Sequence, residues 1–283
     1  MIDNFCVLIL SHGRADNVVT LKTLQEYGYL GDWYILIDDE DSQITEYQRR
    51  YKEHIKIFNK DEISRNFDTC DNFKEKNTVV YARNACWKLA TELGYKYFLE
   101  LDDDYYSFEW RTPHNGKLLV SLCKGKLNTI FEIFINFLKT TPTISIAFAQ
   151  GGDFIGGVGS ASVRDPFRRK LMNSFFCSTE KPFQFLGKIN EDVNTYCLLG
   201  SQGKLFFSYS FIALRQGTTQ ANSGGMTDIY LDKGTYIKSF YSVMLCPSFV
   251  SISSIHDKHI RIHHRINWNA AVPKILSPEW KKV

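Results

Sequence analysis

The stretch YFLELDDDYYSFEW, residues 97–110, places three aspartates directly after an apolar run. We predict a buried strand over residues 95–101, with Asp102, Asp103 and Asp104 at its carboxyl end. Aspartates repel one another and are poor strand formers, so the triplet needs a reason of its own. Two explanations fit these residues. One is a divalent metal site, because Mg²⁺ and Mn²⁺ prefer carboxylate oxygens, and the other is a solvated acidic turn.

The first half of the chain alternates strand and helix patterns. Short apolar runs predict strands at residues 5–10, 33–37 and 55–58, and helical spacing predicts helices at 18–28, 45–55 and 79–94. This order is typical of an α/β fold built on a mostly parallel sheet. Ligands of such sheets bind outside the carboxyl ends of the strands. We therefore expect the polar segments 11–14, 38–41 and 102–104 to meet at one edge.

The second half is less regular. Residues 124–141 predict an amphipathic helix, and residues 144–161 a strand that runs into a glycine-rich loop. Residues 171–250 mix aromatic side chains with short strand-like runs. The polar segment 218–228, TTQANSGGMTD, has the composition of a surface loop or of one that closes over a bound diphosphate.

Composition narrows the class of protein. The 283 residues are 44% hydrophobic and 23% charged, which supports a packed core and argues against global disorder. A formal charge of +3 neither demands nor excludes a nucleic-acid partner. Seven cysteines without a CxxC pair indicate reduced thiols and no zinc site. With no signal peptide or membrane-length apolar run in the sequence, we expect a cytoplasmic protein without a membrane partner.

Four motifs in order resemble a GT-A type, nucleotide-sugar-dependent glycosyltransferase. They are SHGRADNVVTLKTL, a strand ending in acids, YARNACWKLA and LELDDDY. The resemblance implies one GT-A (Rossmann-like) domain over residues 1–283, with a nucleotide-sugar-binding half (1–110) and an acceptor-side half (111–283). It implies donor contacts from Ser11, His12, Gly13, Arg14, Asp38, Asp39, Arg83, Asn84, Asp102 and Asp103. It also implies that Asp102 and Asp104 bind Mn²⁺ or Mg²⁺, with a UDP-sugar as donor.

Each of these roles has a simpler alternative. The loop that carries His12 and Arg14 can serve only to cap the following helix. A surface ion pair with a neighbouring acid would explain Arg83 equally well.

The segment GKINEDVNTYCLL, residues 187–199, resembles the start of an acceptor-side helix in inverting members of this family. By that resemblance Asp192 is the base for the acceptor hydroxyl and Glu191 orients it; ordinary capping of a helix start is the alternative. A late histidine often completes the metal site in the family, here His263 or His264. Alternation along a strand would place these two on opposite faces, so we expect only one to reach the metal. A basic strand end with surface histidines is the alternative.

SHGRADN, NEDVNTY, TTQANSGGM and RIHHRINWNAAVPKIL further resemble the TET/JBP-associated glycosyltransferases, largely of bacteriophages. This implies transfer of a hexose or pentose to a 5-hydroxymethylpyrimidine in DNA. Candidate DNA contacts are the basic segments 164–170 and 259–265. Phe175, Phe176 and Tyr209 would stack on a base or belong to the core. Other acceptors (a glycan, a protein or a free nucleotide) and a non-catalytic domain that binds nucleotide sugars or DNA remain alternatives. Neither the sugar nor the oligomeric state follows from the sequence.

Overall fold

The computed structural model describes residues 2–70, 76–171, 173–217, 237–256, 260–275 and 278. The strands are β1 (Phe5–Leu10), β2 (Asp32–Asp38), β3 (Ile55–Phe58), β4 (Tyr97–Asp102), β5 (Tyr105–His114), β6 (Lys117–Leu122), β7 (Thr143–Ala149), β8 (Phe167–Arg168), β9 (Ser174–Ser178), β10 (Leu205–Gln216), β11 (Val250–His256) and β12 (Ile260–Ile266). The helices are α1 (Val19–Glu26), α2 (Ile44–Tyr51), α3 (Lys60–Ser64), α4 (Val80–Glu92), α5 (Leu127–Thr140), α6 (Ala161–Arg164), α7 (Glu191–Ser201) and α9 (Trp268–Ala271), with 3₁₀ turns η1 (Lys52–His54), η2 (Gly151–Phe154) and η3 (Gly157–Gly159). Residues 237–245 are also helical.

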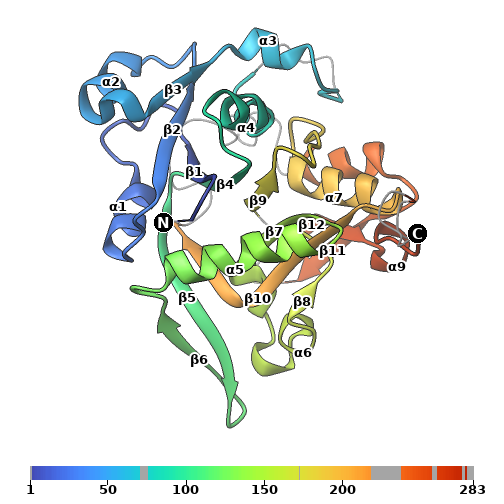
Figure 1. Ribbon diagram of the computed structural model, residues 1–283. Helices are drawn as coiled ribbons and strands as arrows, with labels where there is room; N and C mark the ends of the chain where they lie inside the picture. Colours follow the sequence, from blue (N-terminus) through green and yellow to red (C-terminus); the bar gives the residue numbers. More distant parts are fainter. Residues whose placement is uncertain are drawn as a thin grey trace.

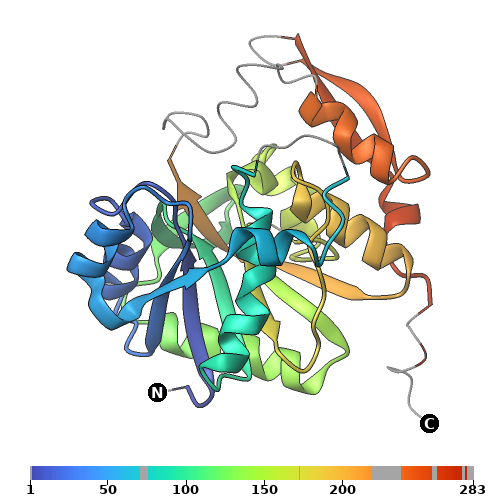
Figure 2. The ribbon, with the colours of Figure 1, turned by 90° about the horizontal axis from the view of Figure 1, so that it is seen from above.

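A large mixed sheet with strand order β3-β2-β1-β4-β9-β7-β10-β5-β6 runs through both halves of the chain. Its first four strands are parallel, so β1, β2, β3 and β4 end at the same edge. From β9 onward most pairings are antiparallel. The strands β11 and β12 form a separate hairpin, drawn in orange apart from the large sheet in Figure 2. The predicted α/β class, a sheet flanked by helices, is confirmed.

Helices cover both faces of the large sheet. One apolar cluster joins α1 and α5 to one face, where Phe131 and Phe134 of α5 pack on Phe148 and Phe176. Figure 1 shows α5 lying across the strands. A second cluster joins α4 and α7 to the other face. Because β9 lies between β4 and β7, Phe175 and Phe176 are fully buried and belong to the core; they cannot stack on a base.

The hairpin β5–β6 differs from the sequence prediction, which gave these residues no strands. Asn115 and Gly116 connect the two strands, with φ of 46° and 74°. Positive φ at both turn residues is the type I′ geometry that an Asn-Gly pair favours, so the sequence did contain a hairpin signal. All seven cysteines are free in the structure, and only Cys70 is not buried. No helix within the described residues is long and apolar enough to cross a membrane.

Candidate active site

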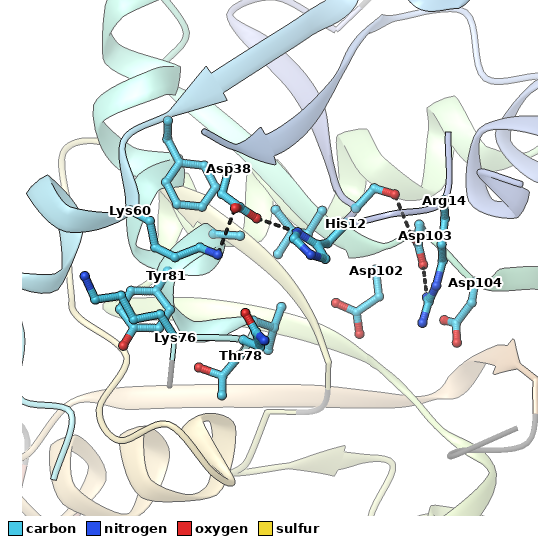
Figure 3. Close-up of a pocket in the computed structure, with 16 residues that line it drawn as sticks. His12, Arg14, Asp38, Lys60, Lys76, Thr78, Tyr81, Asp102, Asp103 and Asp104 are labelled. Atoms are coloured by element: carbon cyan, nitrogen blue, oxygen red, sulfur yellow. Dashed lines mark hydrogen bonds and ion pairs between the residues drawn. The ribbon is translucent and has the colours of Figure 1, made fainter. Parts of the chain in front are cut away.

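A cavity of about 230 Å³ lies at the edge where the parallel strands end. Its polar lining comes from the loops after β1, β2 and β4 and from the segment that enters α4 (Figure 3). These side chains are Ser11, His12, Arg14, Asp38, Lys60, Lys76, Asn77, Thr78, Tyr81, Asp102, Asp103 and Asp104. The three polar segments that the sequence predicted to meet do meet here.

The three acids of the triplet have different surroundings. Asp102 is the last residue of β4, and Asp103 and Asp104 lie in the turn that follows it. Asp103 turns toward the first loop, where Ser11 Oγ donates a hydrogen bond to Oδ2 at 2.6 Å and Arg14 Nη1 donates to Oδ1 at 2.7 Å. Burial raises the pKa of Asp103, and Arg14 opposes that shift. Both Asp103 oxygens are therefore used within the protein.

The carboxylates of Asp102 and Asp104 are less fully engaged by protein groups than that of Asp103. Asp102 lies on the α4 face and accepts a hydrogen bond from Arg83 Nη2 at 3.1 Å. The Asp104 side chain has no hydrogen bond or ion pair with any residue that the structure describes. Burial, followed by repulsion from Asp102 and Asp103, raises the pKa of Asp104 to about 6. Figure 3 shows the Asp102 and Asp104 carboxylates beside the cavity.

The second strand end carries an ion cluster around Asp38. His12 Nδ1 lies 2.7 Å from Asp38 Oδ2, and Lys60 Nζ lies 2.8 Å from Oδ1. Although burial opposes the shift, these contacts lower the pKa of Asp38 to about 2. The same hydrogen bond raises the pKa of His12. Sequence reasoning missed Lys60, although it follows β3, whose end lies at this same edge.

Four predicted donor contacts lie outside the cavity lining: Gly13, Asp39, Asn84 and Arg83. The Gly13 N–H donates to Asp41 Oδ2 at 2.7 Å, in a left-handed turn with φ of 65°. Asp39 accepts the Lys60 backbone N–H at the start of α3. Asn84 bonds both backbone groups of Phe185, at 3.0 Å and 2.8 Å. The polar atoms in these contacts hold loops in place, and donor contact by these residues stays a prediction.

Arg83 is the centre of a buried network. Its side chain is 1% exposed, and its guanidinium lies over the Phe175 ring at 4.7 Å. Nε donates to Glu191 Oε1 at 3.0 Å, Nη2 donates to Asp102, and Nη1 lies 3.7 Å from Glu100 Oε2. Arg83 does not line the cavity, and its ion pairs are buried rather than on the surface. Nucleotide contact by Arg83 stays a prediction.

The acids at the start of α7 differ from each other. Glu191 is bound to Arg83, and its burial, opposed by Arg83, raises its pKa to about 6. The Asp192 carboxylate accepts hydrogen bonds from the backbone N–H groups of Val193 and of Asp192 itself, and it has no ion pair with any described residue. Burial raises its pKa as well, although these hydrogen bonds oppose the shift. One guanidinium thus separates the strand-end acid Asp102 from the helix-start acid Glu191. Acids from the two halves of the chain thus share one cation.

The late histidines are not part of this cluster in the described portion of the chain. His263 and His264 of β12 stack on each other, with ring centroids 4.2 Å apart. A two-stranded ribbon twists strongly, which lets neighbouring rings meet despite the alternation that we expected. Burial, followed by repulsion from His263 and Lys238, lowers the pKa of His264 to about 4. Metal binding by either histidine stays a prediction, and the predicted loop 218–228 lies outside the described residues.

Solved structures resemble the chain only distantly. Glucosyl-3-phosphoglycerate synthase from Mycobacterium tuberculosis, in complex with Mn²⁺, UDP and glucosyl-3-phosphoglycerate, is 12% identical with a TM-score of 0.42, over 93% of this chain and 87% of that chain. The same enzyme with Mn²⁺, UDP and phosphoglyceric acid is 11% identical with the same TM-score, over 93% and 86%. A search of curated protein sequences finds no match.

A sequence model of one family covers most of the chain. The model of the TET-Associated Glycosyltransferase family matches residues 5–225, which include the first loop, Arg83, the acid triplet and the start of α7. The match takes in every part of the site built above except β12. The chain belongs to the TET-associated glycosyltransferases.

Proposed function

We propose that the protein is a metal-dependent inverting glycosyltransferase that moves a sugar from a UDP-sugar to the hydroxyl of a hydroxymethylated pyrimidine in DNA. The single observation that carries this proposal is the Arg83 guanidinium between Asp102 and Glu191. It brings a strand-end acid, suited to a metal and diphosphate, next to a helix-start acid pair, suited to an acceptor hydroxyl.

Each half of the site has a part in the proposed reaction. The cavity beside His12, Asp38 and Lys60 takes the nucleoside, and the triplet faces the diphosphate. Asp192 accepts the proton of the acceptor hydroxyl while that oxygen attacks the anomeric carbon. The bond from this carbon to the diphosphate breaks, and UDP leaves with the electron pair. A single displacement of this kind inverts the anomeric centre.

Asp192 is a better base than Glu191 because its carboxylate has no described ion pair to lose when it takes up a proton, whereas Glu191 would have to weaken its contact with Arg83. Burial raises the pKa of both carboxyls, so it supports a base at this helix start without choosing between them. Glu191 is then the residue that fixes the start of α7 against Arg83.

The residues of the triplet fit a divalent cation. Among the described residues there is no group of three or more His, Cys, Asp or Glu that could enclose an ion. Asp102 and Asp104 alone offer two carboxylates, and Mg²⁺ or Mn²⁺ is commonly held by one or two carboxylates together with substrate phosphates and water. When bound, the ion would offset the charge that builds up on the leaving diphosphate. Its identity is part of the proposal.

The acceptor class rests on the family and on the sequence motifs that resemble its phage members. A hydroxymethyl group on a pyrimidine offers a primary alcohol that a carboxylate base can deprotonate during attack. A glycan, protein or free nucleotide acceptor would use the same chemistry. A domain that binds its ligand without turnover would need no catalytic base such as the one proposed at Asp192.

One screen tests the proposal. Several UDP-sugars are crossed with unmodified DNA, hydroxymethylated DNA and free hydroxymethylated nucleotides, with Mn²⁺ or with EDTA, and released UDP is measured. We expect Mn²⁺-dependent release only when a hydroxymethylated acceptor is present. UDP-sugar binding without release in every mixture would instead establish a binding domain.

A further inference from the structure

A basic surface forms where two segments distant in the sequence meet around Trp268. One hollow, of about 160 Å³, is lined by Arg168, Arg169 and Lys170 together with Trp268 and Asn269. An adjoining hollow, of about 460 Å³, is lined by Arg265 and by the same Trp268 and Asn269. The arginine surface is defined here as Arg168, Arg169 and Arg265 around Trp268.

The three arginines are available for an external anion. None of them has an ion pair with a carboxylate within the described residues, and Arg169 and Arg265 are exposed. Lys170, by contrast, is paired with the buried Asp153. Asp165 is the one acid among the residues that line the two hollows, so positive charge is in excess there.

The position of Trp268 ties this surface to the acceptor side of the site. Its ring stacks on Tyr196 of α7, with centroids 5.5 Å apart and an interplanar angle of 19°. Tyr196 is four residues after Asp192, so the two lie on the same helix face about one turn apart. A ligand that spans the arginine surface would therefore extend toward the proposed base.

We propose that the arginine surface binds the phosphates of a nucleic-acid strand and holds the acceptor base at the start of α7. This inference rests on the proposed function. Guanidinium groups suit phosphates, and arginines on both sides of an aromatic ring fit a chain of phosphates and bases better than one isolated phosphate. Specific base recognition belongs to the active site, whereas these contacts set affinity and register.

The test measures binding of a fluorescent single-stranded oligonucleotide to the full chain over a range of salt concentrations. The double variant Arg169→Gln/Arg265→Gln is compared with Lys22→Gln/Lys126→Gln, which removes the same charge from exposed positions on α1 and just before α5. We expect the arginine variant to bind at least tenfold more weakly, with a salt slope smaller by about 1.4. We expect the lysine variant to have the same affinity and the same salt slope as the parent. Equal affinity and slope in parent and arginine variant would overturn the proposal.

Two further measurements separate the possible ligands and the two proposals. Millimolar inorganic phosphate should compete only weakly with the oligonucleotide; complete competition would mean a site for a single phosphate. Transfer to a free hydroxymethylated nucleotide should be the same in parent and arginine variant, and transfer to DNA should fall. If no UDP-sugar is turned over but the arginine variant still loses DNA binding, the proposed function fails and the arginine surface stands.

Discussion

The two sides of the active site differ in how their charges are satisfied. On the donor side, Asp38 and Asp103 are held by cations and hydroxyls of their own neighbourhood, at distances of 2.6–2.8 Å. On the acceptor side, Asp192, Arg169 and Arg265 have no ion-pair partner among the described residues. The contacts on the donor side hold its acids in fixed, preorganised positions. The charged groups on the acceptor side remain available, the arginines to an anionic ligand and Asp192 to a proton. Arg83 joins the two sides.

Removing Arg83 should have the largest effect on stability and activity, because Arg83 contacts Asp102 on the donor side and Glu191 on the acceptor side. Arg83→Met leaves the buried Glu100 and Glu191 and the partly exposed Asp102 without their shared cation. We expect a loss of about 3–5 kcal/mol in unfolding free energy and at least a thousandfold drop in kcat/KM. Chemical denaturation and UDP release measure these two effects. Arg49→Met, which removes an exposed arginine of α2, is the control and should change neither by much.

Substitutions of Asp192 and Glu191 should have different effects, because Asp192 is the proposed base and Glu191 the residue that positions α7. Asp192→Asn should lower kcat by about 10²–10⁴ and leave the melting temperature near that of the parent, because this side chain has no described ion pair to lose. Glu191→Gln should lower the melting temperature and reduce kcat less, since the amide can still accept a bond from Arg83. If Asp192→Asn retains most of its rate, the assignment of the base is wrong.

Asp103 and Asp104 should respond in opposite directions. Asp103→Asn weakens contacts with Ser11 and Arg14 and should cost about 1–3 kcal/mol of stability. Asp104→Asn removes a carboxylate that faces two others, so stability without metal should stay equal or rise. Asp104→Asn should also abolish the Mn²⁺ response of transfer. Full activity of this variant in EDTA would rule out the metal site.

Glu100 should affect transfer least and give stability a pH dependence. Burial, opposed by Arg83, raises the pKa of Glu100 from 4.5 to about 8. A raised folded-state pKa gives stability that is complete below about pH 4.5 and is lost as pH rises through about 8. The unfolding free energy of Glu100→Gln should therefore rise by about 4 kcal/mol relative to that of the parent between pH 5 and pH 8.5, because one pKa unit is worth about 1.4 kcal/mol. Parallel pH profiles for the parent and this variant would contradict the assignment; Glu26→Gln, at an exposed position, is the control.

The donor side could be predicted from the sequence because neighbouring residues determine the position of each of its polar segments. Each polar segment directly follows an apolar strand, and parallel strands end at one edge. Alternation along β4 separates Phe98, on one face, from Leu99 and Leu101 on the other. Asp102 ends this strand, and Asp103 and Asp104 form the turn that follows it. Lys60 obeys the same rule but was obscured by a polar, irregular-looking segment.

The acceptor side depends on contacts that local patterns do not encode. Arg83 and Glu191 are 108 residues apart. Taken alone, Arg83 has a surface ion pair as its alternative and Glu191 has helix capping. The arginine surface likewise needs residues 168 and 265 to meet around Trp268. Only tertiary packing sets such pairs, so the sequence predicted the acids of α7 but neither their partner nor their neighbours.

The most direct test is the mass of a hydroxymethylated oligonucleotide after incubation with a UDP-sugar, Mn²⁺ and either the parent or Asp192→Asn. With the parent, we predict a gain of one sugar residue per hydroxymethylated pyrimidine and none on the unmodified oligonucleotide. With equally folded Asp192→Asn, the gain should be at least a hundredfold slower. An unchanged oligonucleotide with every UDP-sugar, or equal rates for the two proteins, would contradict the account.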